Sequence, residues 1–300
     1  MRKIIEPPRG PIKRRGILTT KELSNLKGKK IRIVAFTIVF NEEEIIEKCL
    51  KNTREQGLIP IVIDNGCTDG TIGIVKNMGI PVFECKTEKY HVYLMIERGI
   101  ARARKVGCDW YVLKDADEIF ETYNGRKVIE VVNEADNAGY NCMRFDMYEF
   151  WPTVDDDLSI ADFTERIKHY SYYGSDYLKM IKNSPEIYTR DPHRPGRGST
   201  NKESPTRLLF RHYKFTGLEQ GKKKARNRLI IKRCATKKRH HHRFYDFAGR
   251  KEFLILKGFD VPIDENGFYV LEKRFYSKLH KFDGTWNKER VFDGWRGYWK

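Results

Sequence analysis

The sequence predicts an α/β fold with a mostly parallel central sheet flanked by helices. Two observations support this prediction. Short β-rich apolar runs alternate with segments of helical spacing between residues 31 and 125, which is the pattern of successive βαβ units. The apolar runs are nearly continuous, as expected for strands that are buried on both faces of a parallel sheet.

The elements follow one another in a regular order. The run from Ile31 to Phe40 is interrupted only by Arg32 and Thr37 and predicts the first buried strand. Further strands are predicted at residues 60–63, 80–84 and 110–113. Helices are predicted between the strands at residues 41–55, 72–78 and 93–106. Beyond Arg126 the pattern loosens, and we expect a helix at 128–138, a strand at 141–150, a flexible loop at 192–204 and helical stretches after Arg207.

Size and composition narrow the class of protein. The chain has 300 residues, of which 40% are hydrophobic, and this is enough for a well-buried core. Its longest apolar run is far shorter than the roughly 20 residues that a membrane-spanning helix needs. The N-terminus lacks the apolar region of a signal peptide. The six cysteines stand singly, as in reduced, structural positions. We therefore expect a cytoplasmic protein.

The net charge of +17 indicates a polyanionic partner or surface. Between Arg207 and Lys251 only Glu219 and Asp246 are acidic. Nucleic acid, an anionic membrane surface and the diphosphate of a nucleotide donor all fit this charge, which does not choose among them.

Ligands of parallel sheets bind at the carboxyl ends of the strands. In this sequence, polar side chains follow the predicted strands at these ends. They are Asn41, Glu42, Asp64, Asp115 and Asp117. Asp115 and Asp117 form an Asp-Ala-Asp motif just past a buried strand, where both carboxylates can face one ligand. Carboxylate oxygens together with substrate phosphates suit Mg²⁺ or Mn²⁺. An acidic turn that is merely solvated is the alternative interpretation of this short motif.

The loop from Asp64 to Thr71 separates a strand from a helix. Asp64 is placed to accept hydrogen bonds from a base or a ribose. Asp69 and Thr68 are candidates for ligand contacts, and capping of the following helix is the alternative for both.

These motifs together resemble family 2 glycosyltransferases in their order, spacing and strand context. The resemblance rests on residues 40–43, 64–71 and 115–118, although Asn65 and Cys67 stand where the family usually has Asp and Ser. It implies a Rossmann-like GT-A fold, a UDP- or GDP-sugar donor, a divalent cation and inversion at the anomeric carbon. It further implies that Asp64 contacts the base, that Asp115 contacts the ribose and the metal, and that Asp117 is the direct metal ligand.

The resemblance also suggests a division of the chain. Residues 1–30 are expected to be an extended basic arm, 31–125 the nucleotide-sugar-binding half, and 126–300 the acceptor-binding half with a C-terminal extension of the same domain. Residues 148–153, 211–213 and 242–246 resemble a less-studied subgroup of the superfamily. The acceptor is expected to be a glycan, a lipid-linked sugar or a protein, with peripheral contact to an anionic membrane surface as a further expectation.

Several residues of the second half are candidates for completing the site. A histidine often completes the metal site of GT-A enzymes, and we favour His242 over the other candidates, His193, His212, His240 and His241. Lys222, Lys223, Lys224, Arg226 and Arg228 are candidates for binding donor phosphates. A solvated basic face is the alternative for both sets.

Inverting transfer needs a general base, for which Asp146, Glu149, Asp191 and Glu203 are available. We favour Asp191, followed by Asp146. The aromatic residues around Tyr148 are more typical of a core than of a sugar-stacking platform.

Two other functions compete with glycosyl transfer. A nucleotidyltransferase would carry a glycine-rich basic loop after the first strand, where this chain has Asn41 followed by three glutamates. A non-enzymatic nucleic-acid-binding protein fits the net charge, but neither zinc-finger spacing nor an RNP-type aromatic motif is present.

Overall fold

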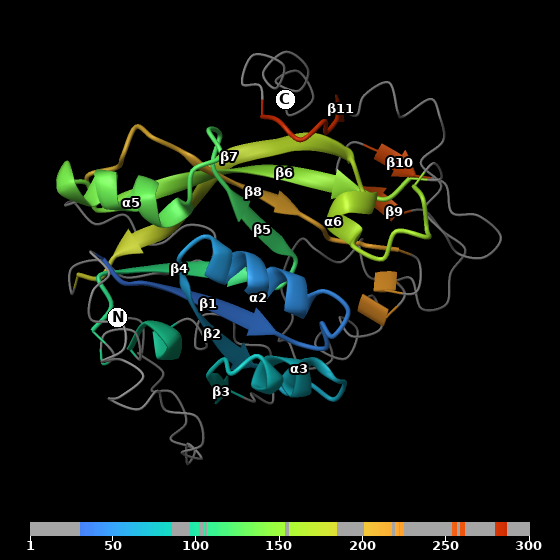
Figure 1. Ribbon diagram of the computed structural model, residues 1–300, viewed down its shortest axis with the longest axis horizontal. Helices are drawn as coiled ribbons and strands as arrows, with labels where there is room; N and C mark the ends of the chain where they lie inside the picture. The colour runs from blue at the N-terminus through green and yellow to red at the C-terminus, as the bar shows by residue number, and fades with distance from the viewer. Residues whose placement is uncertain are drawn as a thin grey trace, which may run out of the picture.

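A single sheet organises most of the described residues of the computed structural model. The structure describes residues 31–85, 97–101, 105, 107–153, 156–184, 201–217, 220–221, 223–224, 254–256, 259–261 and 280–286. Within these ranges the sheet has nine strands, in the order β3-β2-β1-β4-β7-β6-β8-β5 with β11 paired to β7 (Figure 1). A separate two-stranded sheet pairs β9 with β10.

The bounds of the elements are as follows. The strands are β1 Ile33–Val39, β2 Ile59–Asp64, β3 Val82–Glu84, β4 Trp110–Asp115, β5 Glu118–Glu121, β6 Cys142–Trp151, β7 His169–Lys182, β8 Leu208–His212, β9 Leu254–Leu256, β10 Phe259–Val261 and β11 His280–Lys281. The labelled helices are α2 Ile46–Glu55, α3 Thr71–Asn77, α5 Val128–Asn137 and α6 Phe163–Arg166.

The first half of the sheet is parallel and the second half is mixed. β3, β2, β1 and β4 pair in parallel, so the carboxyl ends of β1, β2 and β4 meet at one edge. β7 then pairs antiparallel with β4 and β6, whereas β8 runs parallel to β6 and antiparallel to β5. The predicted α/β class with a central sheet and flanking helices is confirmed.

Apolar side chains are buried on both faces of the parallel strands, which explains their nearly continuous hydrophobic runs. On one face Val39 and Val62 pack with residues of α2 and α3, which lie over the same side of the sheet in Figure 1. On the opposite face Phe36 and Ile63 pack with Ile100. This two-sided packing fixes the register of β1 and therefore the position of the loop that follows it.

Several elements differ from those predicted. The segment after Arg207 begins with strand β8, whose residues Leu208 to Phe210 are buried between β6 and β5. The helical stretches expected in this segment are represented by residues 220–221 and 223–224, which are helical. Strands β5 and β7 were not predicted. Within the helix expected at 93–106, the described residues, Glu97 to Ala101 and Lys105, are helical as predicted. Residues 1–30 and most of the loop expected at 192–204 lie outside the described residues.

None of the helices in the described ranges is both long and apolar enough to cross a membrane. The described cysteines are all free thiols, and four of these five are buried.

Candidate active site at the carboxyl edge of the sheet

The Asp-Ala-Asp motif forms the tight turn between β4 and β5. Asp115 is the last residue of β4, and Glu118 is the first of β5, so the turn consists of Ala116 and Asp117. β5 leaves the parallel sheet and pairs with β8, in a register that places Glu118 opposite His212. The backbone N–H of Tyr213 donates to the carbonyl oxygen of Asp117 over 2.8 Å. Strand pairing therefore brings β8 beside a motif that lies almost 100 residues earlier in the chain.

His212 lies between two carboxylates. Its Nδ1 is 3.0 Å from Glu149 Oε2, and its Nε2 is 3.4 Å from Asp117 Oδ1. Glu149 is opposite His212 in the parallel pairing of β6 and β8, which fixes this contact. Burial on its own lowers the pKa of His212, but Glu149 and Asp117 outweigh it and raise the pKa to about 10. In the absence of a further cation, the imidazole is therefore positively charged.

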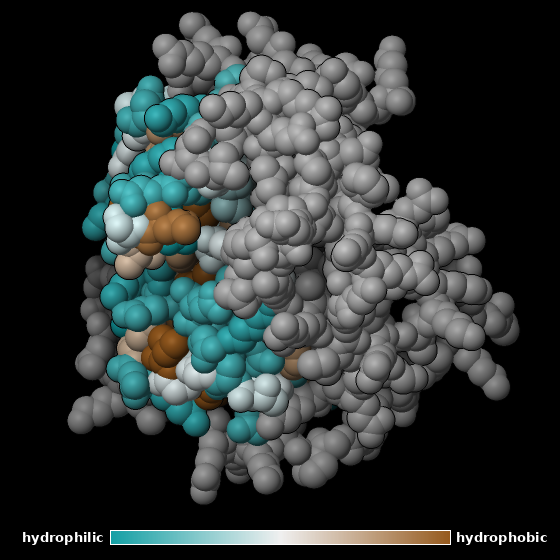
Figure 2. Space-filling model, turned by 90° about the vertical axis from the view of Figure 1, so that its right-hand side faces the viewer, coloured by the Kyte–Doolittle hydropathy of each residue, from teal (hydrophilic) through white to brown (hydrophobic). Residues whose placement is uncertain are grey.

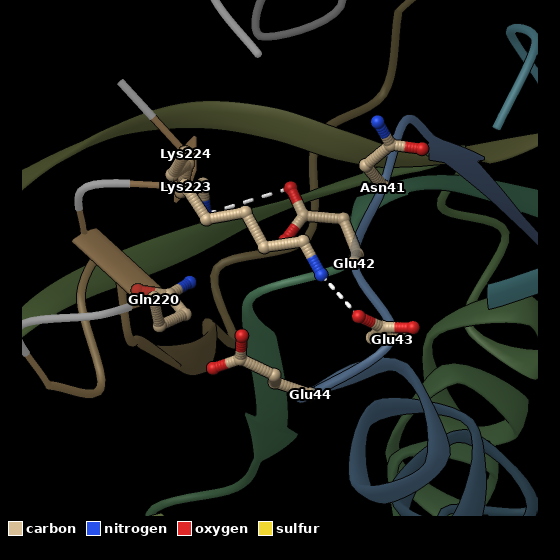
Figure 3. A pocket seen from close by; sticks show the side chains of 7 residues that line it. All are labelled: Asn41, Glu42, Glu43, Glu44, Gln220, Lys223 and Lys224. Carbon is tan, nitrogen blue, oxygen red and sulfur yellow. Dashed lines mark hydrogen bonds and ion pairs between the residues drawn. The ribbon is translucent and has the colours of Figure 1, made fainter. Parts of the chain in front are cut away.

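Two lysines reach the site from residues 220–224. Lys224 Nζ donates to Asp117 Oδ2 over 2.5 Å and lies 3.6 Å from Glu42 Oε1. Lys223 pairs with Glu43 and lies 3.2 Å from Asp69. Figure 3 shows the Lys223 side chain extending across a small pocket to Glu43, and a dashed line joins Lys224 to Glu42. Burial favours the protonated form of Asp117, but Lys224 and His212 hold its pKa well below the usual range.

Asn41 ties the loop after β1 to the loop after β2. Its side-chain Oδ1 accepts a hydrogen bond from the backbone N–H of Thr68 over 2.7 Å, and its Nδ2 donates to Thr68 Oγ1 over 3.2 Å. Asn41 has φ of 57°, the left-handed conformation that residues other than glycine seldom adopt. Such strain concentrates at functional sites, where the surrounding contacts maintain it.

Replacing Asn41 with Ala should destabilise the protein by about 1–3 kcal/mol, because the change keeps the strained backbone and removes the side-chain bonds. Asn41→Gly should cost less, since glycine adopts positive φ without strain. Urea unfolding of both variants measures the difference. Equal losses would assign the whole effect to the bonds with Thr68.

The acidic residues after β2 hold their own loop in shape. Asp64 Oδ1 accepts from the backbone N–H groups of Gly66 and Cys67 over 2.8 and 2.7 Å. Gly66 has φ of 98°, which explains glycine at this position. Asp69 Oδ1 accepts from both the N–H and the hydroxyl of Thr71 at the start of α3. Asp69 thus supports the first turn of that helix and also faces Lys223.

The general-base candidates that the structure describes are engaged elsewhere. Asp146 is buried, pairs with Arg207 over 2.8 Å and accepts from the Tyr123 hydroxyl over 2.5 Å. Glu203 pairs with Arg144 over 2.7 Å. These contacts support structural roles for both carboxylates, while Glu149 orients His212.

Other predicted site residues lie outside the described residues, so their places are not part of the site geometry. They are Asp191, Lys222, Arg226 and His242, with the further candidates His193, His240, His241 and Arg228.

One buried ion pair behind the site was not foreseen. Glu118 and Lys179 pair between β5 and β7, with side chains 2% and 1% exposed. Burial outweighs the lysine and raises the pKa of Glu118 to about 7. Lys114, also buried, donates to the carbonyl oxygen of Cys49 over 3.0 Å. Sequence patterns gave no signal for either contact, because each joins residues that only the sheet topology brings together.

The described surface around this edge is mainly polar. Figure 2 views the side toward which the β1 arrow points in Figure 1, and its described residues are mostly hydrophilic with small separate hydrophobic spots.

Within the described ranges, no group of three His, Cys, Asp or Glu side chains is already arranged to hold a metal ion. Asp117 and His212 bring one carboxylate and one imidazole together, and a metal held there would draw further ligands from a neighbouring carboxylate, substrate or water.

Comparisons with known proteins found a matching family model and several similar proteins. The family model described as Glycosyl transferase family 2 matches residues 35–197, more than half of the chain. The SPbeta prophage-derived glycosyltransferase SunS of Bacillus subtilis (strain 168) is 28% identical over 106 residues, or 35% of this chain and 25% of SunS. Glycosyltransferase SunS of Bacillus phage SPbeta matches equally. The chain thus spans about a quarter of the length of these curated relatives.

Solved structures of glucosyl-3-phosphoglycerate synthase from Mycobacterium tuberculosis are also similar. The complex with Mn²⁺ and UDP-glucose is 20% identical, with a TM-score of 0.30, and the match covers 46% of this chain and 49% of that chain. The complex with Mg²⁺ and UDP is 20% identical, with a TM-score of 0.30, and the match covers 44% and 49% of the two chains. The family match includes most of β1, all of β2 to β7, and the Asp-Ala-Asp turn.

Proposed function

This chain belongs to glycosyl transferase family 2, and from that premise we propose that it transfers a sugar from a nucleoside diphosphate donor to an acceptor hydroxyl. The observation that carries the proposal is the meeting of Asp117, His212 and Glu149 at the carboxyl edge of the sheet. Ligands of open α/β sheets bind at this edge. The loops after β1 and β2 border the same place through Glu42 and Asp69, which face Lys224 and Lys223.

The side chains that meet at this edge of the sheet are suitable ligands for a divalent cation. A carboxylate and an imidazole are accepted by Mn²⁺, and the Nδ1–H of His212 can donate to Glu149, which leaves Nε2 directed toward Asp117. A carboxylate behind a ligating histidine is a common way of orienting such a ligand. We propose that Asp117 and His212 would hold the cation together with Asp115, with Nε2 of His212 releasing its proton to solvent as the cation binds. When bound, it supplies Lewis-acid stabilisation of the departing diphosphate.

The residues proposed to contact the nucleotide-sugar donor lie in the loops at the carboxyl ends of the strands. Asp64 is proposed to contact the base, and Asn41, Glu42, Asp69 and Asp115 to shape the donor site. Lys223 and Lys224 are proposed to bind the diphosphate by charge-assisted hydrogen bonds, since their ammonium groups already lie at this edge. His212 was only one of several candidate histidines in the sequence. We now propose it, rather than His242, as the histidine that ligates the metal.

Transfer is proposed to proceed with inversion, by in-line attack of the acceptor hydroxyl on the anomeric carbon. The hydroxyl proton then passes to a general base, for which Asp191 stays the proposed residue. A glycan, a lipid-linked sugar or a protein is the proposed acceptor class. The net charge of +17 supports an anionic or membrane-borne acceptor and peripheral contact with an anionic surface.

A thermal-shift screen of nucleotides and nucleotide sugars, each with and without Mn²⁺, tests the proposal. A ligand at 100 times its Kd stabilises the native state by about 2.7 kcal/mol, which is readily measured. We expect stabilisation by one nucleoside diphosphate and its sugar, dependent on Mn²⁺. A shift with nucleoside triphosphates alone would favour a nucleotidyltransferase. A shift with RNA and with none of the nucleotides would favour the nucleic-acid-binding alternative.

A further inference from the structure

Lys224 holds the carboxylate that the proposed metal requires. Its Nζ is 2.5 Å from Asp117 Oδ2 and 3.6 Å from Glu42 Oε1. The side chains of Lys224 and Asp117 are each only 8% exposed, so this is a desolvated contact rather than a surface ion pair. An ammonium group has three donors and no lone pair, and therefore it cannot join Asp117 as a metal ligand.

Resting on the proposed function, we propose that Lys224 is a built-in competitor of the metal, which the donor diphosphate draws away when metal and nucleotide bind together. A divalent cation bound to Asp117 would be repelled by the nearby ammonium of Lys224, because little water would separate the two charges. Metal alone must displace the ammonium from Asp117 without offering it a new partner. A diphosphate offers the ammonium an anionic partner at the same edge of the sheet.

The charges of the site allow a divalent cation to displace Lys224 from Asp117, so the lysine does not substitute for the metal permanently. Carboxylates outnumber cations among the described groups here. The carboxylates are Glu42, Glu43, Asp69, Asp115, Asp117 and Glu149, and the cations are Lys223, Lys224 and His212. The excess negative charge leaves the site able to accept a divalent cation. The long, flexible stem of lysine allows its head group to change partners while its backbone stays in place.

This arrangement makes metal and nucleotide binding mutually dependent. A nucleotide that removes Lys224 from Asp117 raises the affinity for metal, and by linkage the metal raises the affinity for nucleotide by the same factor. The enzyme would therefore bind little free metal and would load metal and donor as a unit. Deleting the ammonium should relieve the competition and weaken the coupling.

The test is a Mn²⁺ titration of wild type and Lys224→Met by isothermal calorimetry, first without nucleotide and then with UDP or GDP. Methionine keeps an unbranched side chain of similar length and removes the charge. We expect Lys224→Met to bind Mn²⁺ alone roughly tenfold more tightly than wild type, because one neighbouring positive charge is gone. The factor by which nucleotide improves Mn²⁺ binding should fall in the variant. Lys224→Arg, which keeps the charge, should behave like wild type.

Lys223→Met is the matched control. It removes the same charge from the adjacent residue, but Lys223 pairs with Glu43 and Asp69 rather than with Asp117. We expect it to change the affinity for Mn²⁺ alone by less than about threefold, as a more distant and more exposed charge should.

Mn²⁺ binding by Lys224→Met that is no tighter than in wild type, or no tighter than in Lys223→Met, would overturn the inference. So would a wild type whose affinity for Mn²⁺ is the same with and without nucleotide, a result that does not depend on the variant folding. Metal-dependent nucleotide binding by the wild type is read in the same titrations. If the wild type shows this dependence and Lys224→Met binds Mn²⁺ no more tightly than wild type, only the competitor role fails. If the wild type lacks it, the proposed function fails as well, because metal and nucleotide affinities are linked.

Discussion

Replacing Asp117 with Ala is expected to abolish Mn²⁺-dependent nucleotide binding, with a loss of at least about 100-fold in affinity. Asp117 is the carboxylate on which His212 and Lys224 converge, and it lies in the turn at the carboxyl edge of the sheet. Glu149 contacts His212 and Glu42 lies near Lys224, whereas Asp117 is paired with both groups. Calorimetric titration of the nucleotide at saturating Mn²⁺ measures the effect.

The control for this change must separate binding from folding. Asp117→Asn keeps the shape of the side chain and removes only its charge, and we expect it to lose nucleotide affinity almost as fully as Asp117→Ala. Asp162 is a matched aspartate that pairs with Lys48 over 2.6 Å at the start of α6, and Asp162→Asn should leave nucleotide affinity unchanged. Unaltered affinity in Asp117→Ala would refute the assignment of Asp117 as a metal ligand. His212→Gln, assayed alongside, should show a smaller loss in the same direction.

Replacing Lys179 with Met is expected to destabilise the fold by about 3–5 kcal/mol, because it leaves the Glu118 carboxylate buried without its partner. Both side chains are almost completely buried, and the pair joins β5 to β7 directly behind the Asp-Ala-Asp turn. An uncompensated charge at such a place must either stay ionised at high cost or take up a proton. Chemical unfolding at neutral pH, read as the change in the denaturation midpoint, measures the loss.

A second substitution identifies the cause. Lys179→Met combined with Glu118→Gln removes both charges, and we expect it to recover a large part of the lost stability, since no unpaired charge remains. Lys51→Met breaks the pair with Glu47, whose side chains are more than half exposed, and should cost no more than about 0.5 kcal/mol. Equal losses from Lys179→Met and from the double variant would show that packing of the lysine stem, and not the buried charge, carries the effect.

The parallel half of the fold was predictable because its signals are local. The strand at 31–40 is observed as Ile33–Val39, the one at 60–63 as Ile59–Asp64, and the one at 110–113 as Trp110–Asp115. Continuous apolar runs identify strands that are buried on both faces, and polar residues immediately after them mark the ligand-binding edge. The positions of Asn41, Asp64 and Asp117 at that edge follow directly from these patterns.

The mixed half was less predictable. β7 carries polar and aromatic residues over fourteen positions, and its register with β6 shifts in several places, so it lacks a simple alternation. β8 lies in a strongly basic segment, and its strand conformation comes from burial of Leu208 to Phe210 between β6 and β5. Local composition cannot report such pairing, because the partners lie many residues away in sequence.

The sequence by itself determined the α/β class, the order of the first strands and the edge at which the polar residues gather. These depend on hydrophobic periodicity and on residues adjacent in the chain. Only the tertiary structure decided that His212, oriented by Glu149, is the imidazole that faces Asp117, and that Lys224 occupies the second oxygen of the same carboxylate. The physical reason is that charged side chains find partners through strand pairing and burial, and neither is encoded in the spacing of one segment.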